Sequence, residues 1–100
     1  MRKYELVCLI QPDLDEAALN GVIERVRGWV TEAGGTVDKV DMWGKRRLAY
    51  EIRKQRDSNY VLFDLSMAPT TTSGLEQNLR YTETIMRHML TLVTEATPVV

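Results

Sequence analysis

Hydrophobic residues along this chain follow two different spacings, and each spacing predicts one type of element. Between residues 3 and 10, apolar side chains occupy every second position, which indicates a strand with one fully apolar face. After a break at Pro12-Asp13, apolar positions recur at helical spacing up to Ala33. Asp15 is well placed to cap this helix, and Gly34-Gly35 ends it, because glycine enters the left-handed conformation without a clash at Cβ.

The middle of the chain returns to a spacing of two and predicts a hairpin. Alternation continues from Thr36 to Ile52, so we expect one long strand, bulged at Gly44 where the missing side chain lets the strand bend. The polar segment Arg56-Asp57-Ser58-Asn59 is a turn signal. A second alternating run, residues 60–67, then completes the hairpin.

The last third predicts a short helix and a final strand. The cluster from Thr70 to Ser73 supplies caps for a helix with Leu75 and Leu79 on one face, and residues 85–93 form an apolar strand. The order of elements is two interleaved strand-helix-strand units with right-handed crossovers. It predicts an α+β, ferredoxin-like βαββαβ sandwich, in which a four-stranded antiparallel sheet carries two helices on one face. In this fold the second strand lies at a sheet edge.

Composition agrees with one small soluble domain. The 100 residues are 44% hydrophobic and 27% charged, enough for one core, and we expect a single ferredoxin-like domain over 1–96 with a short tail over 97–100. No window approaches the roughly 20 apolar residues of a membrane span, so we expect a cytoplasmic protein without membrane contact. The single cysteine, Cys8, lies in an apolar run and is expected to be a buried free thiol.

Charge is distributed unevenly, although the net charge is only −1. Residues 45–56 contain six basic residues and one acidic residue, a local net charge of +5. Cations on an edge strand keep other chains from pairing there, which is the simpler interpretation. The accompanying aromatics Trp43, Tyr50 and Tyr60 favour a second one, because cations interleaved with aromatic rings suit unpaired RNA. The pattern leaves open whether Trp43 fills the core or makes contacts.

Enzymatic chemistry finds little support in the sequence. The single histidine, His88, lies in the last predicted strand without a nucleophile at a recognisable spacing. Asp13, Asp15 and Glu16 cluster at a helix start, where acids complement the helix dipole, and no further group converges to hold a metal ion. We therefore expect no catalytic site, no metal, no cofactor and no small-molecule substrate.

Several segments together resemble one known family. They are Met1–Glu5, Pro12-Asp13, Trp43–Ile52, the strand at Tyr60, Leu79–Tyr81 and Ile85–Arg87. Together they resemble the family of the sixth protein of the bacterial small ribosomal subunit over nearly the whole chain. The block WGKRRLAYEI at 43–52 is the most specific part, and the family's fold is the one that the periodicity predicts independently.

The resemblance implies a non-catalytic ribosomal protein of the cytoplasm. Such a protein binds the central domain of the small-subunit ribosomal RNA as a heterodimer with the eighteenth protein of that subunit. The RNA contacts that it implies are Arg2, Lys3, Lys45, Arg46, Arg47, Arg80 and Arg87. The partner contacts that it implies are Asp41, Met42, Trp43, Arg46, Arg47, Leu48 and Tyr50. In one departure, the position after Tyr50 is often proline in relatives and is Glu51 here, which adds a negative charge to the basic segment.

Two other functions of the same architecture stay open on the residues alone. An acylphosphatase-like hydrolase would need a phosphate-cradling loop with an arginine and a nearby asparagine, which Gln11-Pro12-Asp13 does not resemble. A ligand-sensing module could instead dimerise through the open sheet face, where Val7, Leu9 and Leu62 are apolar.

Overall fold

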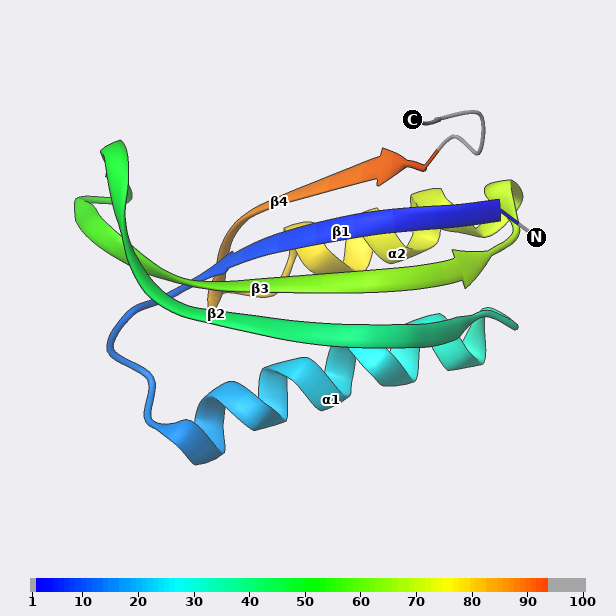
Figure 1. Cartoon of the computed structure of the whole chain (residues 1–100), viewed down its shortest axis with the longest axis horizontal. Coiled ribbons are helices and arrows are strands. Elements are labelled where there is room, and N and C mark those ends of the chain that lie inside the picture. Colours follow the sequence, from blue (N-terminus) through cyan, green and yellow to red (C-terminus); the bar gives the residue numbers. More distant parts are fainter. Residues whose placement is uncertain (1, 94–100) are drawn as a thin grey trace, which may run out of the picture.

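The six elements expected from the hydrophobic spacing are all present in the computed structural model, which describes residues 2–93 (Figure 1). The strands and helices are β1 (Arg2–Ile10), α1 (Glu16–Glu32), β2 (Thr36–Ile52), β3 (Gln55–Met67), α2 (Thr72–Arg80) and β4 (Ile85–Leu92), with a short 3-10 turn at Pro69–Thr71 before α2. The expected tail over 97–100 lies outside the described residues. None of the helices within 2–93 has the length and apolar character that crossing a membrane requires.

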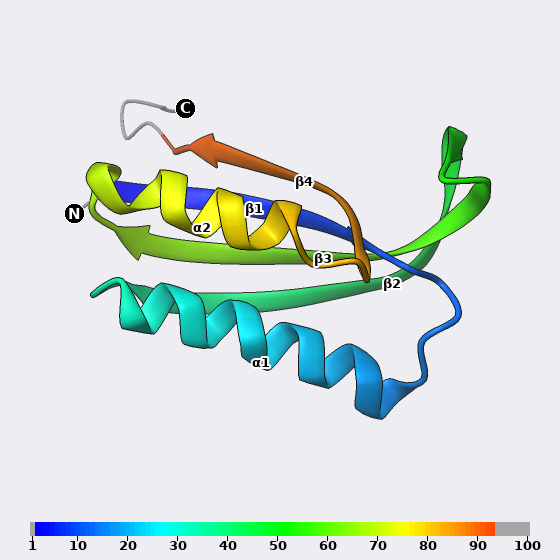
Figure 2. The same ribbon diagram turned by 180° about the vertical axis from the view of Figure 1, so that it is seen from behind.

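The sheet is antiparallel throughout, in the order β2-β3-β1-β4. Helix α2 lies behind the strands in Figure 1 and in front of them in Figure 2, and α1 packs on the same face. The opposite face of the sheet is left open. This arrangement confirms the ferredoxin-like prediction, and it confirms that β2 is an edge strand.

The core fills the space between the sheet and the two helices. Alternate side chains of β1 point into it, as the spacing of two predicts, and they meet one stripe of each helix. The buried apolar residues include Tyr4, Leu6, Cys8 and Ile10 of β1, Val22, Val26 and Val30 of α1, Phe63 of β3, and Leu75 and Leu79 of α2. Burial raises the pKa of the Cys8 thiol to about 12, so the thiol is protonated at neutral pH and packs as a small hydrophobe.

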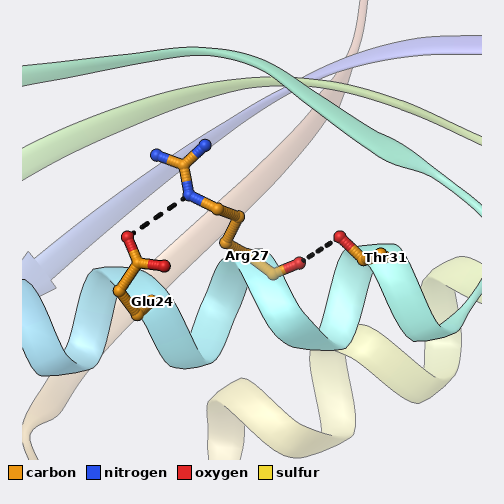
Figure 3. Close-up of polar contacts among 3 residues, drawn as sticks. All are labelled: Glu24, Arg27 and Thr31. Carbon is orange, nitrogen blue, oxygen red and sulfur yellow. Dashed lines mark hydrogen bonds and ion pairs between the residues drawn. The ribbon is translucent and has the colours of Figure 1, made fainter.

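Helix α1 starts and ends where its sequence signals predict. The Asp15 carboxylate accepts a hydrogen bond from the Ala18 backbone N–H at 2.8 Å, and Gly34 follows the helix with a φ of +86°. Along α1, the Arg27 guanidinium lies 3.5 Å from the Glu24 carboxylate, and the Thr31 hydroxyl donates to the Arg27 carbonyl (Figure 3). An exposed pair of this kind contributes little to stability.

The start of β2 is fixed to β3 through Asp38. Its carboxylate accepts hydrogen bonds from the Ser66 hydroxyl at 2.6 Å and the Thr36 hydroxyl at 3.0 Å. These two bonds, the Ser66 bond first, lower the pKa of Asp38 below its ordinary value. They span the shift in register that separates Val37 from Lys39.

The hairpin between β2 and β3 has a different turn from the one predicted. Residues 56–59 are not a turn, because β3 already begins at Gln55. The connection is the two-residue loop Arg53-Lys54, closed by the pair Ile52 and Gln55, with φ of 52° at Arg53 and 65° at Lys54. Positive φ at both loop residues is what a type I′ hairpin turn requires, although neither residue is the usual asparagine or glycine.

The supposed turn residues instead join β3 to the end of β1. The Ser58 hydroxyl donates to the Ile10 carbonyl at 3.0 Å, and the Asn59 side-chain amide donates to the Gln11 carbonyl at 3.0 Å. Both side chains are buried. Their polar groups therefore satisfy backbone carbonyls where the first strand ends, which is a use of serine and asparagine that turn statistics do not reveal.

Candidate functional site

The far half of the β2–β3 hairpin bends away from the rest of the sheet (Figures 1 and 2). The bend follows a bulge, because the register with β3 shifts between Met42 and Gly44, and Gly44 has a φ of +82°. The predicted bulge is thus confirmed. It separates a part of β2 that belongs to the sheet from a part that carries the basic residues.

An arginine and two aromatic rings form a stack beside this bulge. The rings of Trp43 and Tyr60 are parallel, with centroids 6.3 Å apart, and the Arg46 guanidinium lies 5.7 Å from the centre of the Trp43 ring. The Nε–H of Arg46 also donates to the Trp43 carbonyl at 3.4 Å. Trp43 remains 47% exposed, so it does not fill the core. The stack holds a guanidinium plane at the surface of an edge strand.

The three consecutive cations at 45–47 have no acidic partner in the described part of the chain. Lys45, Arg46 and Arg47 are exposed, and no carboxylate among residues 2–93 lies within 4.0 Å of their charged groups. Glu51, the acidic departure from the family pattern, lies 3.3 Å from Arg56. The extra acid therefore faces Arg56 and leaves the three consecutive cations uncompensated.

Two arginines tie the outer hairpin to the other edge of the sheet. Arg87, in β4, donates to the Tyr50 hydroxyl at 2.8 Å. Arg53, in the hairpin loop, donates to the Glu83 backbone carbonyl at 2.8 Å. Arg53 was not among the predicted RNA or partner contacts. Its contact with Glu83 depends on the position of the hairpin loop, which the sequence pattern did not predict.

Between these ties, the hairpin overhangs the open sheet face and forms a groove of about 280 Å³. Its lining is largely apolar and comes from all four strands. The side chains that matter most are Leu48, Tyr50 and Ile52 of β2, Val7 and Leu9 of β1, Tyr60 of β3 and Met89 of β4. Tyr50 and Met89 are among the exposed large hydrophobic residues, so this groove is an unfilled apolar surface.

The seven predicted RNA contacts do not form one patch. Lys45, Arg46 and Arg47 follow the hairpin, while Arg80 ends α2 and Arg87 lies near the start of β4. Arg2 and Lys3 lie at the other end of the sheet. Because Arg87 pairs with Leu9, seven residues along β1 from Arg2, the two arginines are about 23 Å apart along that strand.

The predicted partner contacts all lie in β2, but they face different ways. Met42 pairs with buried Val61 on the helix side, whereas Trp43 stacks on Tyr60 at the open face. Asp41 lies within the sheet and is half-buried, while Leu48 and Tyr50 line the groove. The set therefore surrounds the edge strand.

The residues with candidate catalytic or metal-binding chemistry stay apart. His88 is a mostly buried side chain with its Nε2 3.8 Å from Glu76, and the acids near Asp15 serve the start of α1. Within 2–93, no three histidine, cysteine, aspartate or glutamate side chains converge as metal ligands would.

The fold and its basic edge hairpin define a small structural protein that presents binding surfaces. The family described as Ribosomal protein S6 matches residues 3–91, and the chain belongs to this family. It is 42% identical to the small ribosomal subunit protein bS6 of Clostridium botulinum, over 90% of this chain and 96% of that protein. It is 40% identical to the bS6 protein of Moorella thermoacetica, over 95% and 97% of the two chains.

A solved structure agrees with this membership. The crystal structure of the 30S ribosomal protein S6 of Thermotoga maritima superposes with a TM-score of 0.87 at 30% identity, over 92% of this chain and 87% of that chain. The chain is therefore a structural constituent of the bacterial small ribosomal subunit, located in the ribosome in the cytoplasm, and not an enzyme. Because the chain belongs to this ribosomal family, the family function takes the place of the hydrolase and ligand-sensing alternatives.

Proposed function

We propose that the chain binds the central domain of the small-subunit ribosomal RNA together with the eighteenth protein of that subunit. In doing so it supports assembly of the subunit and, through it, translation. The observation that carries the proposal is the exposed stack of Arg46 on Trp43, next to Lys45 and Arg47 on a free sheet edge.

On the RNA side, the hairpin supplies both charge and stacking. Lys45 and Arg47 can neutralise phosphates, and Arg46 offers a guanidinium plane already held against a ring. Arg2, Lys3, Arg80 and Arg87 are further RNA contacts in this proposal. Each phosphate that is neutralised releases counterions, so binding should weaken with salt, with a log-log slope of about −0.7 to −0.9 per contact.

On the protein side, β2 offers an edge and a groove. The outer edge of β2 carries backbone groups that no strand in the described residues pairs, and a partner segment can use them. The half-exposed Met42 and the groove residues Leu48 and Tyr50 supply apolar contact area, with Asp41 and Trp43 beside them. Arg46 and Arg47 lie between the two surfaces and serve both partners.

The test replaces Arg46 and Arg47 together by alanine. Loss of two phosphate contacts should lower the magnitude of the salt slope by about 1.4 to 1.8, and assembly with the partner and the RNA should weaken. The isolated fold should stay nearly intact, because both side chains are exposed. The control is the double change of Arg25 and Arg27 to alanine, which removes the same charge from α1. Because Arg27 pairs with Glu24, the free energy of unfolding of both variants is measured in parallel.

Reconstitution of RNA, partner and chain, read by sedimentation and by RNA binding at several salt concentrations, measures both effects. Binding to the partner alone, measured in parallel, separates the two roles of the arginine pair. Unchanged assembly of the Arg46/Arg47 variant would remove these residues from the interface.

A further inference from the structure

A second hollow, of about 200 Å³, lies where the hairpin loop approaches the end of α2 and the start of β4. Four basic residues line it: Arg53 from the loop, Arg80 from α2, and Arg87 and His88 from β4. The hairpin loop is distant in the sequence from the other two segments, which follow one another closely. The fold therefore gathers basic side chains around one space, which we call the arginine cleft.

The arginines of this cleft form no ion pair with the residues that the structure describes. Among residues 2–93, no carboxylate lies within 4.0 Å of the guanidinium of Arg53, Arg80 or Arg87. Of the two nearby acidic residues, Glu76 has its carboxylate beside His88, and Glu83 contacts Arg53 through its backbone carbonyl and not through its carboxylate. Three like charges around one hollow repel one another unless an anion enters.

Most of the guanidinium N–H donors in the cleft have no protein acceptor among residues 2–93. Each guanidinium has five N–H donors. Arg53 uses one on the Glu83 carbonyl and Arg87 uses one on the Tyr50 hydroxyl, and Arg80 makes no side-chain hydrogen bond within the described part of the chain. These two hydrogen bonds fix the positions of Arg53 and Arg87 and leave four N–H donors on each guanidinium for a ligand.

The local backbone adds to this placement. Arg53 sits in a loop where two non-glycine residues have positive φ, a conformation that costs about 1 kcal/mol or more per residue. The tight loop puts Arg53 at the hairpin tip, within reach of the start of β4.

We propose that Arg53, Arg80 and Arg87 form a phosphate-binding site that holds a phosphodiester group of RNA. A guanidinium matches two phosphate oxygens with parallel N–H donors, and three of them around one hollow suit a single group with several acceptor oxygens. The site is distinct from the cations at 45–47 and brings in Arg53 as an anion contact. That the phosphate belongs to RNA rests on the proposed function, whereas anion binding itself does not.

The first test uses inorganic phosphate and the isolated full chain. In an NMR titration at low ionic strength, the side-chain Nε–H signals of Arg53, Arg80 and Arg87 should shift together and saturate together. Arg80→Gln, which disturbs no side-chain bond in 2–93, should weaken this response several-fold. Arg25→Gln on α1 removes the same charge elsewhere and should leave the response unchanged.

The second test measures RNA binding in the complex with the partner. Arg53→Gln and Arg80→Gln should each lower the magnitude of the salt slope by about 0.7 to 0.9, and Arg80→Lys should retain the slope, because it retains the charge. The proposal would be overturned if Arg53→Gln and Arg80→Gln bound RNA with the same salt slope as the unchanged chain.

The two tests separate the cleft from the wider function. If the unchanged chain with its partner binds no RNA, the proposed function fails, and the phosphate titration still decides the site. If the three arginine Nε–H signals shift together with phosphate, the cleft is a site for free phosphate. If they do not, the proposed phosphate site is overturned.

Discussion

Replacing Tyr50 by phenylalanine should loosen the outer hairpin while leaving the groove's ring in place. The change removes the hydroxyl that accepts the 2.8 Å hydrogen bond from Arg87. A net contribution of about 0.5 to 1.5 kcal/mol is usual for such a bond, and the lower part of that range applies because Tyr50 is 62% exposed. A loss of about 0.5 to 1 kcal/mol corresponds to a two- to fivefold rise in the population with a detached hairpin.

Hydrogen exchange and a double-mutant cycle measure this tie. Backbone amides of β2 beyond Gly44 should exchange two to five times faster in Tyr50→Phe, while amides of β1 should not change. The cycle with Arg87→Gln, followed by urea unfolding, should show a coupling of about 0.5 to 1 kcal/mol. Tyr81→Phe, at a tyrosine that is 74% exposed, is the matched control.

Partner binding should weaken less than hydrogen exchange accelerates. The apparent affinity is proportional to the fraction of molecules whose hairpin is in place, so it falls only as far as the detached population reduces that fraction. Additive free energies of unfolding in the cycle, with unchanged exchange, would show that Arg87 and Tyr50 do not hold the hairpin.

Three further experiments test the packing of the core and the hairpin loop. Gly35→Ala should destabilise the fold by about 2 kcal/mol or more in urea unfolding, because its Cβ would lie 2.5 Å from the Ser66 carbonyl oxygen; Gly21→Ala, with nothing within 4 Å, should stabilise α1 by about 0.5 to 1 kcal/mol, and equal effects would contradict the close approach. Lys54→Gly should raise the free energy of unfolding in urea by about 1 kcal/mol, because glycine adopts a positive φ without strain. A lower free energy of unfolding would refute strain at Lys54. Cys8 should resist alkylation at pH 8 in the native protein and react fully in urea, as the raised pKa and burial require, whereas rapid native labelling would disprove its burial.

Periodicity was enough to predict the elements and their layers. Apolar side chains alternate along β1 and recur at helical spacing along α1 because one face of each must meet the same core. The Asp15 cap and the Gly34 stop were visible for the same reason, since each satisfies a local backbone need. The bulge at Gly44 likewise depends on one residue's conformational freedom.

Features that depend on distant contacts were not predictable. Ser58 and Asn59 have turn-forming side chains, but carbonyls 48 residues away receive their hydrogen bonds, so local statistics gave the wrong turn. Arg53 escaped notice for the same reason, because its position follows from the true loop. The groove and the arginine cleft exist only once the hairpin bends over the sheet.

The strand order has a consequence for folding during synthesis of the chain on a ribosome. Of the four strands, β1 leaves the exit tunnel first and lies inside the sheet, and its two neighbours, β3 and β4, are the last strands made: Leu6 pairs with Phe63 and with Leu90. Until residue 92 has been synthesised, β1 has at most one neighbour and exposes the backbone groups that β4 will cover. Completion of the fold must therefore follow translation of almost the whole described chain, so a pause in the β4 codons would prolong a state with an open central strand.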